Sequence, residues 1–229
     1  MIYKCWIVPA VFLLSIINIF SLEITERDLE AYIRGEYNRS SNYYGEISIV
    51  GALELQNHFK IRGGFAYGKN MHNTDINSFI NTKYSPFSGI PLGFSVSYIY
   101  NSFPEYSTHT HSLLPLISFN GERAGITAGV NFRFTSFFYE SPILETILSL
   151  HTYFNFIITD TLRIGMGFGN ISDFMAKNLS AYSVSFYVSI LFFENWSLIN
   201  EVEFMQSGGD GLSTTFYGFS WRGGVKFSW

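Results

Sequence analysis

The chain has little cysteine and little charge. Its only cysteine is Cys5, near the start, so a chain shortened by processing would have no disulfide and no thiol chemistry. Lysine and arginine total 14 against 18 acidic residues, a net charge of −4. That balance argues against nucleic acid as a partner. No phosphate-binding loop or calcium loop is present either, and we expect no cofactor.

Long apolar runs are also lacking, with one exception. Residues 5–20 (CWIVPAVFLLSIINIF) carry no charge, follow Lys4 and are interrupted by Pro9. This run is too short to span a bilayer comfortably. It predicts a secretory signal peptide over residues 1–21, cleaved after Ser21, followed by one domain over residues 22–229. An uncleaved membrane anchor is the alternative.

The chain is rich in aromatic residues, and these alternate with small or polar residues along the sequence. Aromatics make up 19% of it, yet the mean hydropathy is only +0.15. Apolar and polar positions that alternate with period two indicate strands. The alternation predicts about twelve strands, at residues 29–37, 45–55, 59–68, 76–84, 92–100, 112–119, 124–138, 145–158, 162–169, 182–193, 196–204 and 215–229.

Three of these segments alternate poorly. Residues 76–84 are mostly Asn, Ser and Thr, and residues 145–158 alternate loosely. In residues 112–119, Leu114 and Leu116 are apolar on the otherwise polar face, and Pro115 cannot donate to a ladder, so we expect an irregularity there. Ten or eight strands are the alternatives to twelve.

The last fifteen residues, TFYGFSWRGGVKFSW, form the clearest strand. One face carries an aromatic set, Tyr217, Phe219, Trp221, Phe227 and Trp229, and the other is small or cationic. A bare apolar strand is an aggregation hazard unless it is paired, and closing a barrel removes the free edge. Here the sequence resembles bacterial outer-membrane β-barrel proteins, which typically end on an aromatic residue at the close of an amphipathic strand.

The resemblance implies an all-β fold, a closed antiparallel transmembrane barrel in the outer membrane. It also implies the lipid bilayer as a partner and an assembly machinery that recognises the aromatic set of the last strand. Short and long connections alternate along the chain, as expected for periplasmic turns and external loops. Barrel closure would place Arg222 and Lys226 beside Glu30 and Glu36.

Periodicity alone does not say which face of the barrel is outside. Bulky rings crowd the apolar face and gather near strand ends, which favours lipid on the outside. The opposite face is rich in Gly and Ser and carries both signs of charge. The predicted lumen-lining residues are Glu30, Arg34, Glu36, Glu46, Glu54, Lys60, Arg62, Arg133, Arg163, Glu201, Glu203, Arg222 and Lys226. They either pair along the wall or line a narrow pore.

Two constellations could carry chemistry. His109 and His111 share a face but have no evident third ligand, so no metal site is assigned. Ser149, His151 and Asn155 share one face, and outer-membrane phospholipases use these residue types on a barrel wall. The order Ser-x-His departs from the His-x-Ser arrangement of that family, so we interpret these residues as polar lining and assign no catalytic residue.

The sequence therefore predicts an outer-membrane barrel that is not an enzyme. It would act as a narrow passive channel for small polar solutes, or as a structural surface protein whose loops face outward. Two alternatives remain open at this point: a phospholipase-like hydrolase on the barrel wall, and a soluble periplasmic barrel that binds an apolar ligand.

Overall fold

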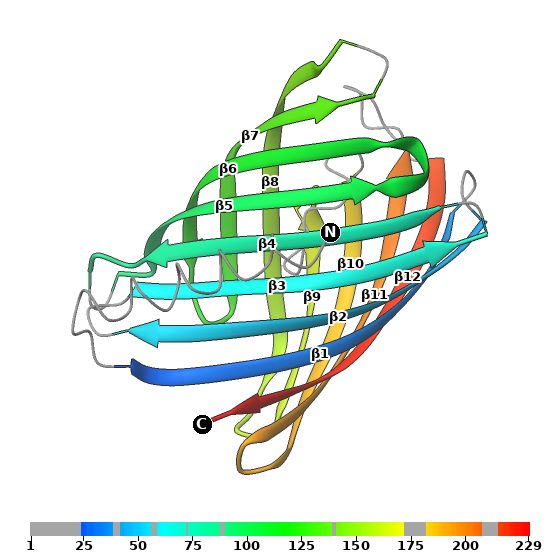
Figure 1. The fold of residues 1–229 in the computed structure, drawn as a ribbon. Helices are drawn as coiled ribbons and strands as arrows, with labels where there is room; N and C mark the ends of the chain where they lie inside the picture. Colours follow the sequence, from blue (N-terminus) through cyan, green and yellow to red (C-terminus); the bar gives the residue numbers. More distant parts are fainter. Residues whose placement is uncertain are drawn as a thin grey trace.

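The computed structural model describes residues 24–38, 42–55, 59–71, 73–87, 90–138, 141–171, 182–207 and 215–229. The predicted signal peptide lies outside these residues and stays a prediction. Twelve strands form a closed antiparallel barrel in which each strand pairs with its sequence neighbours and β12 closes onto β1 (Figure 1). The strands are β1 (Ile24–Asn38), β2 (Asn42–Leu55), β3 (Phe59–Asn70), β4 (Thr74–Tyr84), β5 (Leu92–Phe103), β6 (Thr108–Asn120), β7 (Ala124–Ser136), β8 (Ile143–Ile158), β9 (Leu162–Gly169), β10 (Tyr182–Phe193), β11 (Trp196–Ser207) and β12 (Thr215–Ser228).

The predicted strands are confirmed, and most extend further than the alternation indicated. Even the weakest, residues 76–84, lies within β4. A short 3₁₀ helix, η1 (Pro104–Tyr106), follows β5. Among the described residues, no helix is long and apolar enough to cross a membrane. We call the end of the barrel that carries the β7–β8, β9–β10 and β11–β12 connections the long-loop end, and the opposite end the short-turn end. The β1–β2, β3–β4 and β5–β6 connections, at the same end, are shorter than predicted because the flanking strands extend further.

The side chains sort by face as the strand period requires. On β1, Ile33 is 54% exposed, whereas Tyr32 and Arg34 on either side of it are 8% exposed. The same alternation on the other strands leaves Ile47, Phe65, Phe132 and many similar side chains on the outer surface. An outer face of large apolar side chains suits lipid and would be costly in water. A soluble barrel with an apolar interior has the opposite arrangement.

Aromatic side chains mark both ends of this outer face. Near the long-loop end, the Tyr37 ring lies 5.3 Å from that of Tyr43 and 6.1 Å from that of Phe219. Near the short-turn end, the Phe227 ring lies 4.8 Å from Trp196 and 5.2 Å from Trp229. Rings with polar tips favour the headgroup regions of a bilayer, so the two groups are placed as aromatic girdles.

The irregularity expected at Pro115 is present on one side of β6. Pairing with β7 stops at Leu113 opposite Phe132 and resumes at Leu116 opposite Gly129, with the register unchanged. Proline has no N–H to donate, which accounts for the gap. On the other side of β6, pairing with β5 is continuous, and Pro115 is opposite Val96.

Candidate functional site

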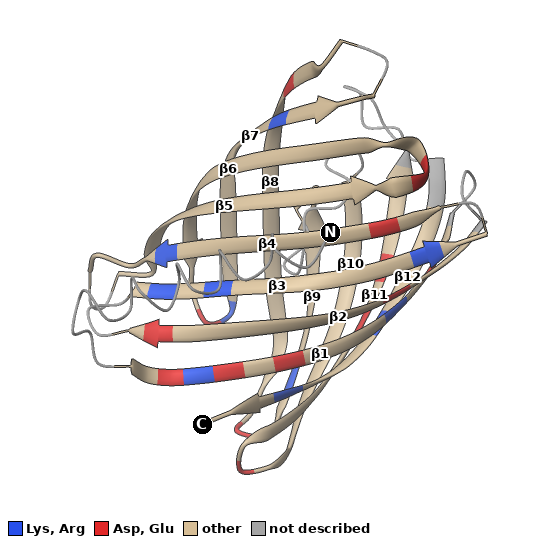
Figure 2. Ribbon diagram, in the orientation of Figure 1, with Lys and Arg blue, Asp and Glu red and all other residues tan. Residues whose placement is uncertain are grey.

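The interior of the barrel has two unlike walls. Charged residues concentrate on β1, β2, β3, β11 and β12, which are adjacent because β12 closes onto β1 (Figure 2). Strands β5, β6 and β10 contain no Asp, Glu, Lys or Arg. We call the first group of strands the charged wall. We call the group β4–β10 the neutral wall, because its charged residues are few: Asp75, Lys83, Arg133, Glu145 and Arg163.

An ion-pair network holds the charged wall together at the seam. Arg34 and Arg222 are opposite each other in the β1–β12 register, and both are buried. Arg34 Nη2 lies 3.1 Å from Glu36 and 3.4 Å from Glu203. Arg222 Nη1 lies 2.9 Å from Glu201, and Ser220 donates a hydrogen bond to Glu203 at 3.1 Å. Acids from β1 and β11 therefore neutralise two facing guanidinium groups.

A second set of pairs lies closer to the short-turn end. Asp28 Oδ2 binds Lys226 at 2.9 Å and Lys60 at 3.5 Å. Arg62 binds Glu30 at 2.6 Å, and the Tyr32 hydroxyl donates to the same carboxylate oxygen at 2.9 Å. The seam itself is confirmed, and the register places Lys226 directly opposite Glu30, as expected. The close ion pairs are made with other acids: Lys226 binds Asp28, and Arg222 binds Glu201.

The remaining predicted lining residues are more peripheral. Glu54 lies 3.8 Å from Lys60, and its side chain is 40% exposed. Arg133 binds Glu145 at 2.8 Å on the neutral wall. Arg163 is exposed on β9, one residue after that strand begins at the short-turn end. Glu46 is buried, and its carboxylate accepts a hydrogen bond from Tyr44 at 2.9 Å.

Unpaired neutral groups line the neutral wall. The register places Asn77, Asn101, Thr110 and Thr135 in one row across β4 to β7. Both side-chain polar atoms of Asn77 and one of Asn101 are buried and have no hydrogen-bond partner among the described residues. Asn131 and Ser149, on β7 and β8, are also fully buried and lack a partner in the same part of the chain. Buried polar groups in proteins are nearly always satisfied, so these groups require water or a solute.

Apolar side chains also point inward on the neutral wall. Leu114 and Leu116 pack with Ile99, and Phe79, Ile147 and Ile171 cover them. The apolar positions that looked misplaced in the sequence are thus part of an interior cluster.

Ile171 reaches this cluster because the chain leaves the wall after β9. Asn170 takes the place of a further strand residue: its Nδ2 donates to Leu148 at 2.8 Å, and its Oδ1 accepts from the Leu150 N–H at 2.8 Å.

The two predicted histidines lie on the outer face and not in the lumen. His109 Nδ1 is 2.9 Å from the Tyr100 hydroxyl, and His111 Nδ1 is 2.7 Å from the Tyr98 hydroxyl. Hydroxyl groups thus satisfy both imidazoles at one nitrogen. Among the described residues, no group of three or more His, Cys, Asp or Glu side chains is placed to hold a metal ion.

The Ser149, His151 and Asn155 set does point inward, as expected, but it is not assembled for catalysis. Ser149 Oγ has no hydrogen-bond partner, so no imidazole activates it. Asn155 donates to the backbone oxygen of Glu122 at 2.5 Å and accepts from the Tyr187 hydroxyl. All three side chains are buried inside the barrel, away from the lipid-facing surface.

The aromatic set of the last strand lies largely as predicted. Phe219, Trp221 and Trp229 are 44%, 41% and 53% exposed on the outer face. Phe227 lies between the rings of Trp196 and Trp229. Tyr217 is in β12, but its side chain lies outside the described residues. The backbone of Trp229 exchanges two hydrogen bonds with Arg27, at 2.9 and 3.1 Å, and so extends the seam by one pair.

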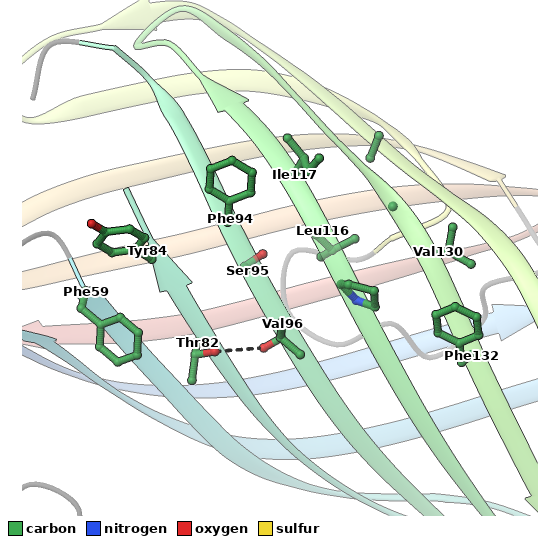
Figure 3. A pocket seen from close by; sticks show the side chains of 13 residues that line it. Phe59, Thr82, Tyr84, Phe94, Ser95, Val96, Leu116, Ile117, Val130 and Phe132 are labelled. Atoms are coloured by element: carbon green, nitrogen blue, oxygen red, sulfur yellow. Dashed lines mark hydrogen bonds between the residues drawn. The ribbon is translucent and has the colours of Figure 1, made fainter. Parts of the chain in front are cut away.

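A groove of about 550 Å³ crosses β3 to β7 on the lipid-facing side (Figure 3). Rings of Phe59, Tyr84, Phe94 and Phe132 surround smaller side chains, and no charged residue lines it. The Thr82 hydroxyl, one of the few polar groups in the lining, is 3.5 Å from the Val96 carbonyl oxygen. This lining matches the rest of the apolar outer face and offers no convergent polar groups for a specific ligand.

Comparison with known proteins supports the barrel assignment. No protein-family model matches this chain, and no curated protein matches it by sequence. Its fold is similar to that of a KdgM porin in complex with disordered oligogalacturonate, with a TM-score of 0.60, 11% identity, and coverage of 88% of this chain and 99% of the porin. The translocator domain of the autotransporter NalP from Neisseria meningitidis has a TM-score of 0.56 and 10% identity over 96% of this chain and 94% of the domain. A NanC porin has a TM-score of 0.56 and 12% identity over 86% of this chain and 98% of the porin. The chain thus has the fold of outer-membrane β-barrel proteins of a porin-like class.

Proposed function

We propose that this protein is an integral outer-membrane channel that passes small polar solutes. One observation carries the proposal: polar side chains point inward from both the charged wall and the neutral wall of a twelve-stranded barrel whose outer face is apolar. A barrel of this strand number can leave space between its walls. The similarity in fold to the KdgM and NanC porins supports the same function.

The charges of the interior favour a narrow channel that admits small solutes without a strong preference for one sign. The network contains both signs, and the most buried bases, Arg34 and Arg222, are held by acids. Lys60, Arg62 and Lys226 keep 36%, 24% and 27% of their side-chain surface exposed. These three bases are therefore the ones that a passing ion would meet first.

Delivery to the membrane is part of the proposal. A signal peptide over residues 1–21 would direct secretion, and the assembly machinery would recognise the outward aromatic set of β12 before that strand pairs with β1. What supports the second step is the orientation of Phe219, Trp221 and Trp229, which lie on the outer face beside the closing seam.

Conductance of the refolded protein in planar bilayers tests the channel directly. We expect ion-conducting steps, and we expect Lys60→Gln with Arg62→Gln to shift the selectivity toward cations. Lys69→Gln is the matched control, because Lys69 is exposed on the outer face of the same strand. A correctly folded protein without conductance would overturn the proposal and favour a structural surface protein.

A further inference from the structure

An aromatic pocket of about 640 Å³ opens at the long-loop end of the neutral wall. Four rings line it, those of Phe103, Tyr106, Phe137 and Phe138, and Glu105 is the one charged residue among the described residues of its lining. Phe103 pairs with Thr108, and both belong to the inward-pointing sets of their strands. Phe137 follows β7 and continues its inward set, two positions after Thr135. The pocket is therefore at the rim of the lumen on its neutral side.

Hydrogen bonds fix the shape of this pocket. Tyr106 Oη donates to Asn73 Oδ1 at 2.6 Å, which ties η1 to the β3–β4 connection. The Ser107 N–H donates to the Pro104 carbonyl oxygen at 3.1 Å, with Ser107 in the left-handed region at φ 47°. A hydrogen bond with Thr74 holds the pKa of Glu105 below its ordinary value. A pocket built on such contacts is largely preformed.

The row of Asn77, Asn101, Thr110 and Thr135 lies next to the aromatic pocket, one inward position further into the barrel on β5, β6 and β7. Asn101 and Thr135 are each two residues from a ring of the pocket, Phe103 and Phe137. Three of the row's amide atoms are buried and unpartnered, and the Thr110 and Thr135 hydroxyls are 3.3 Å apart. We call these four residues the amide–threonine row.

The chemistry of the row selects among solutes. An amide offers both donors and acceptors, and a sugar hydroxyl is likewise both a donor and an acceptor. β5 and β6, at the centre of the row, contain no Asp, Glu, Lys or Arg, and the nearby Arg133 is bound to Glu145 at 2.8 Å. The acids nearest to the row and the pocket are Asp75 on β4 and Glu105, which disfavour an anionic solute. A cationic solute would have to displace the hydrogen bonds that Tyr44 and Thr74 make to these two acids. An uncharged solute with several hydroxyl groups would satisfy the row and lay its apolar C–H faces on the rings.

We propose that the neutral wall binds uncharged polyhydroxylated solutes of sugar type, which dock at the aromatic pocket and pass onto the amide–threonine row. This inference rests on the proposed channel function and specifies its solute class. The alternative is that only water occupies the amide–threonine row, and the test below distinguishes this alternative from solute binding.

The test measures how three solutes of similar size affect ion current through single channels: glucose, gluconate and glucosamine. We expect glucose to reduce the current in a concentration-dependent way, and the two charged analogues to do so more weakly. Asn101→Leu should raise the half-blocking concentration of glucose about tenfold, which corresponds to about 1.4 kcal/mol and is the size expected for a hydrogen bond lost in a buried site. Thr110→Val should act in the same direction.

Matched controls come from the outer face. Asn200→Leu and Thr82→Val make the same chemical changes at positions whose side chains point away from the lumen, on β11 and β4. They should leave the glucose effect unchanged. A changed migration of unheated protein on detergent gels would identify a variant that fails to fold, and Phe137→Ala would then test the pocket separately.

The outcomes separate the two proposals. Absence of any conductance overturns the channel and this inference together. Conductance without a glucose effect, which is the result for water alone, overturns the inference and leaves the channel standing. A stronger effect of gluconate or glucosamine than of glucose, or equal effects of Asn101→Leu and Asn200→Leu, would also overturn it.

Discussion

Arg34 and Arg222 are directly opposite one another on the strands that close the barrel, and both are buried. Two facing guanidinium groups repel, so this arrangement depends on the carboxylates around them. Glu36 comes from β1, and Glu201 and Glu203 come from β11. The seam between β1 and β12 is therefore stabilised by a third strand.

Neutralising Glu203 should destabilise the barrel. Glu203→Gln leaves Arg34 with one acid fewer while it still faces Arg222, and breaking a buried pair costs roughly 3 kcal/mol. Adding Arg34→Met to Glu203→Gln should restore much of the loss, because it removes the repulsion. Urea unfolding in detergent, followed by tryptophan fluorescence, measures both. Glu122→Gln in the exposed β6–β7 turn is the control, and a failure of Arg34→Met to rescue would contradict the account.

A charge on the outer face should harm the protein more than the same charge inside. Phe132 is 45% exposed in the apolar outer face, whereas Thr127 on the same strand points inward. Arginine on the lipid face costs about 2–4 kcal/mol at mid-depth. Phe132→Arg should therefore reduce refolding into vesicles well below Thr127→Arg, as measured by heat-modifiable migration on gels. Equal yields would mean that the faces are wrongly assigned.

Gly129 should not tolerate a side chain. An added Cβ would lie 2.1 Å from the Pro115 carbonyl oxygen, and a backbone atom cannot move aside cheaply. Gly129→Ala should cost roughly 1–3 kcal/mol of stability through overpacking. Gly51→Ala is the matched control, since nothing lies within 4 Å of its added Cβ. Denaturant midpoints for the two variants give the comparison, and similar midpoints would contradict the close approach.

The closing seam can be trapped by a disulfide. Ala31 and Val225 are directly opposite on β1 and β12, at a separation that suits a disulfide for a cross-strand pair. With Cys5 absent, Ala31→Cys with Val225→Cys should crosslink in the folded barrel under mild oxidation. Leu198 is opposite Val225 on the next strand, so Ala31→Cys with Leu198→Cys should not crosslink. Non-reducing gels distinguish the pairs, and crosslinking of both or of neither argues against this register.

The sequence was sufficient to predict the strands, because alternation survives wherever one face meets lipid. The alternation was weakest at residues 76–84, where Asn77 and Asn81 point inward from the neutral wall and the outward positions include Ser78 and Thr82. Both faces of that segment are therefore partly polar. The rings of Phe132, Phe219 and Trp221 indicated the outer face because aromatic size and position near strand ends follow from lipid contact.

Which acid binds which base was beyond the sequence. Arg222 meets Glu201 on β11, and Arg62 meets Glu30 across β2, so the partners depend on side-chain reach inside the closed barrel. The alternation placed Leu114 on the inward face, but its packing against Ile99 and the unpaired state of Asn101 were missed for a similar reason. The surroundings of both side chains are set by neighbouring strands inside the barrel. Alternation along one strand carries no information about those neighbours.

The way in which the Asn170 side chain ends the pairing of β8 and β9 also bears on how this barrel can evolve. One side chain and one backbone N–H complete the hydrogen bonds of Leu148 and Leu150 where β9 ends, at 2.8 to 2.9 Å. The wall is thereby finished at a single position, because Asn170 supplies these hydrogen bonds to Leu148 and Leu150 without a further residue of β9. Insertions or deletions after Asn170 would leave these hydrogen bonds intact, so this connection can diverge in length and sequence while the scaffold is retained.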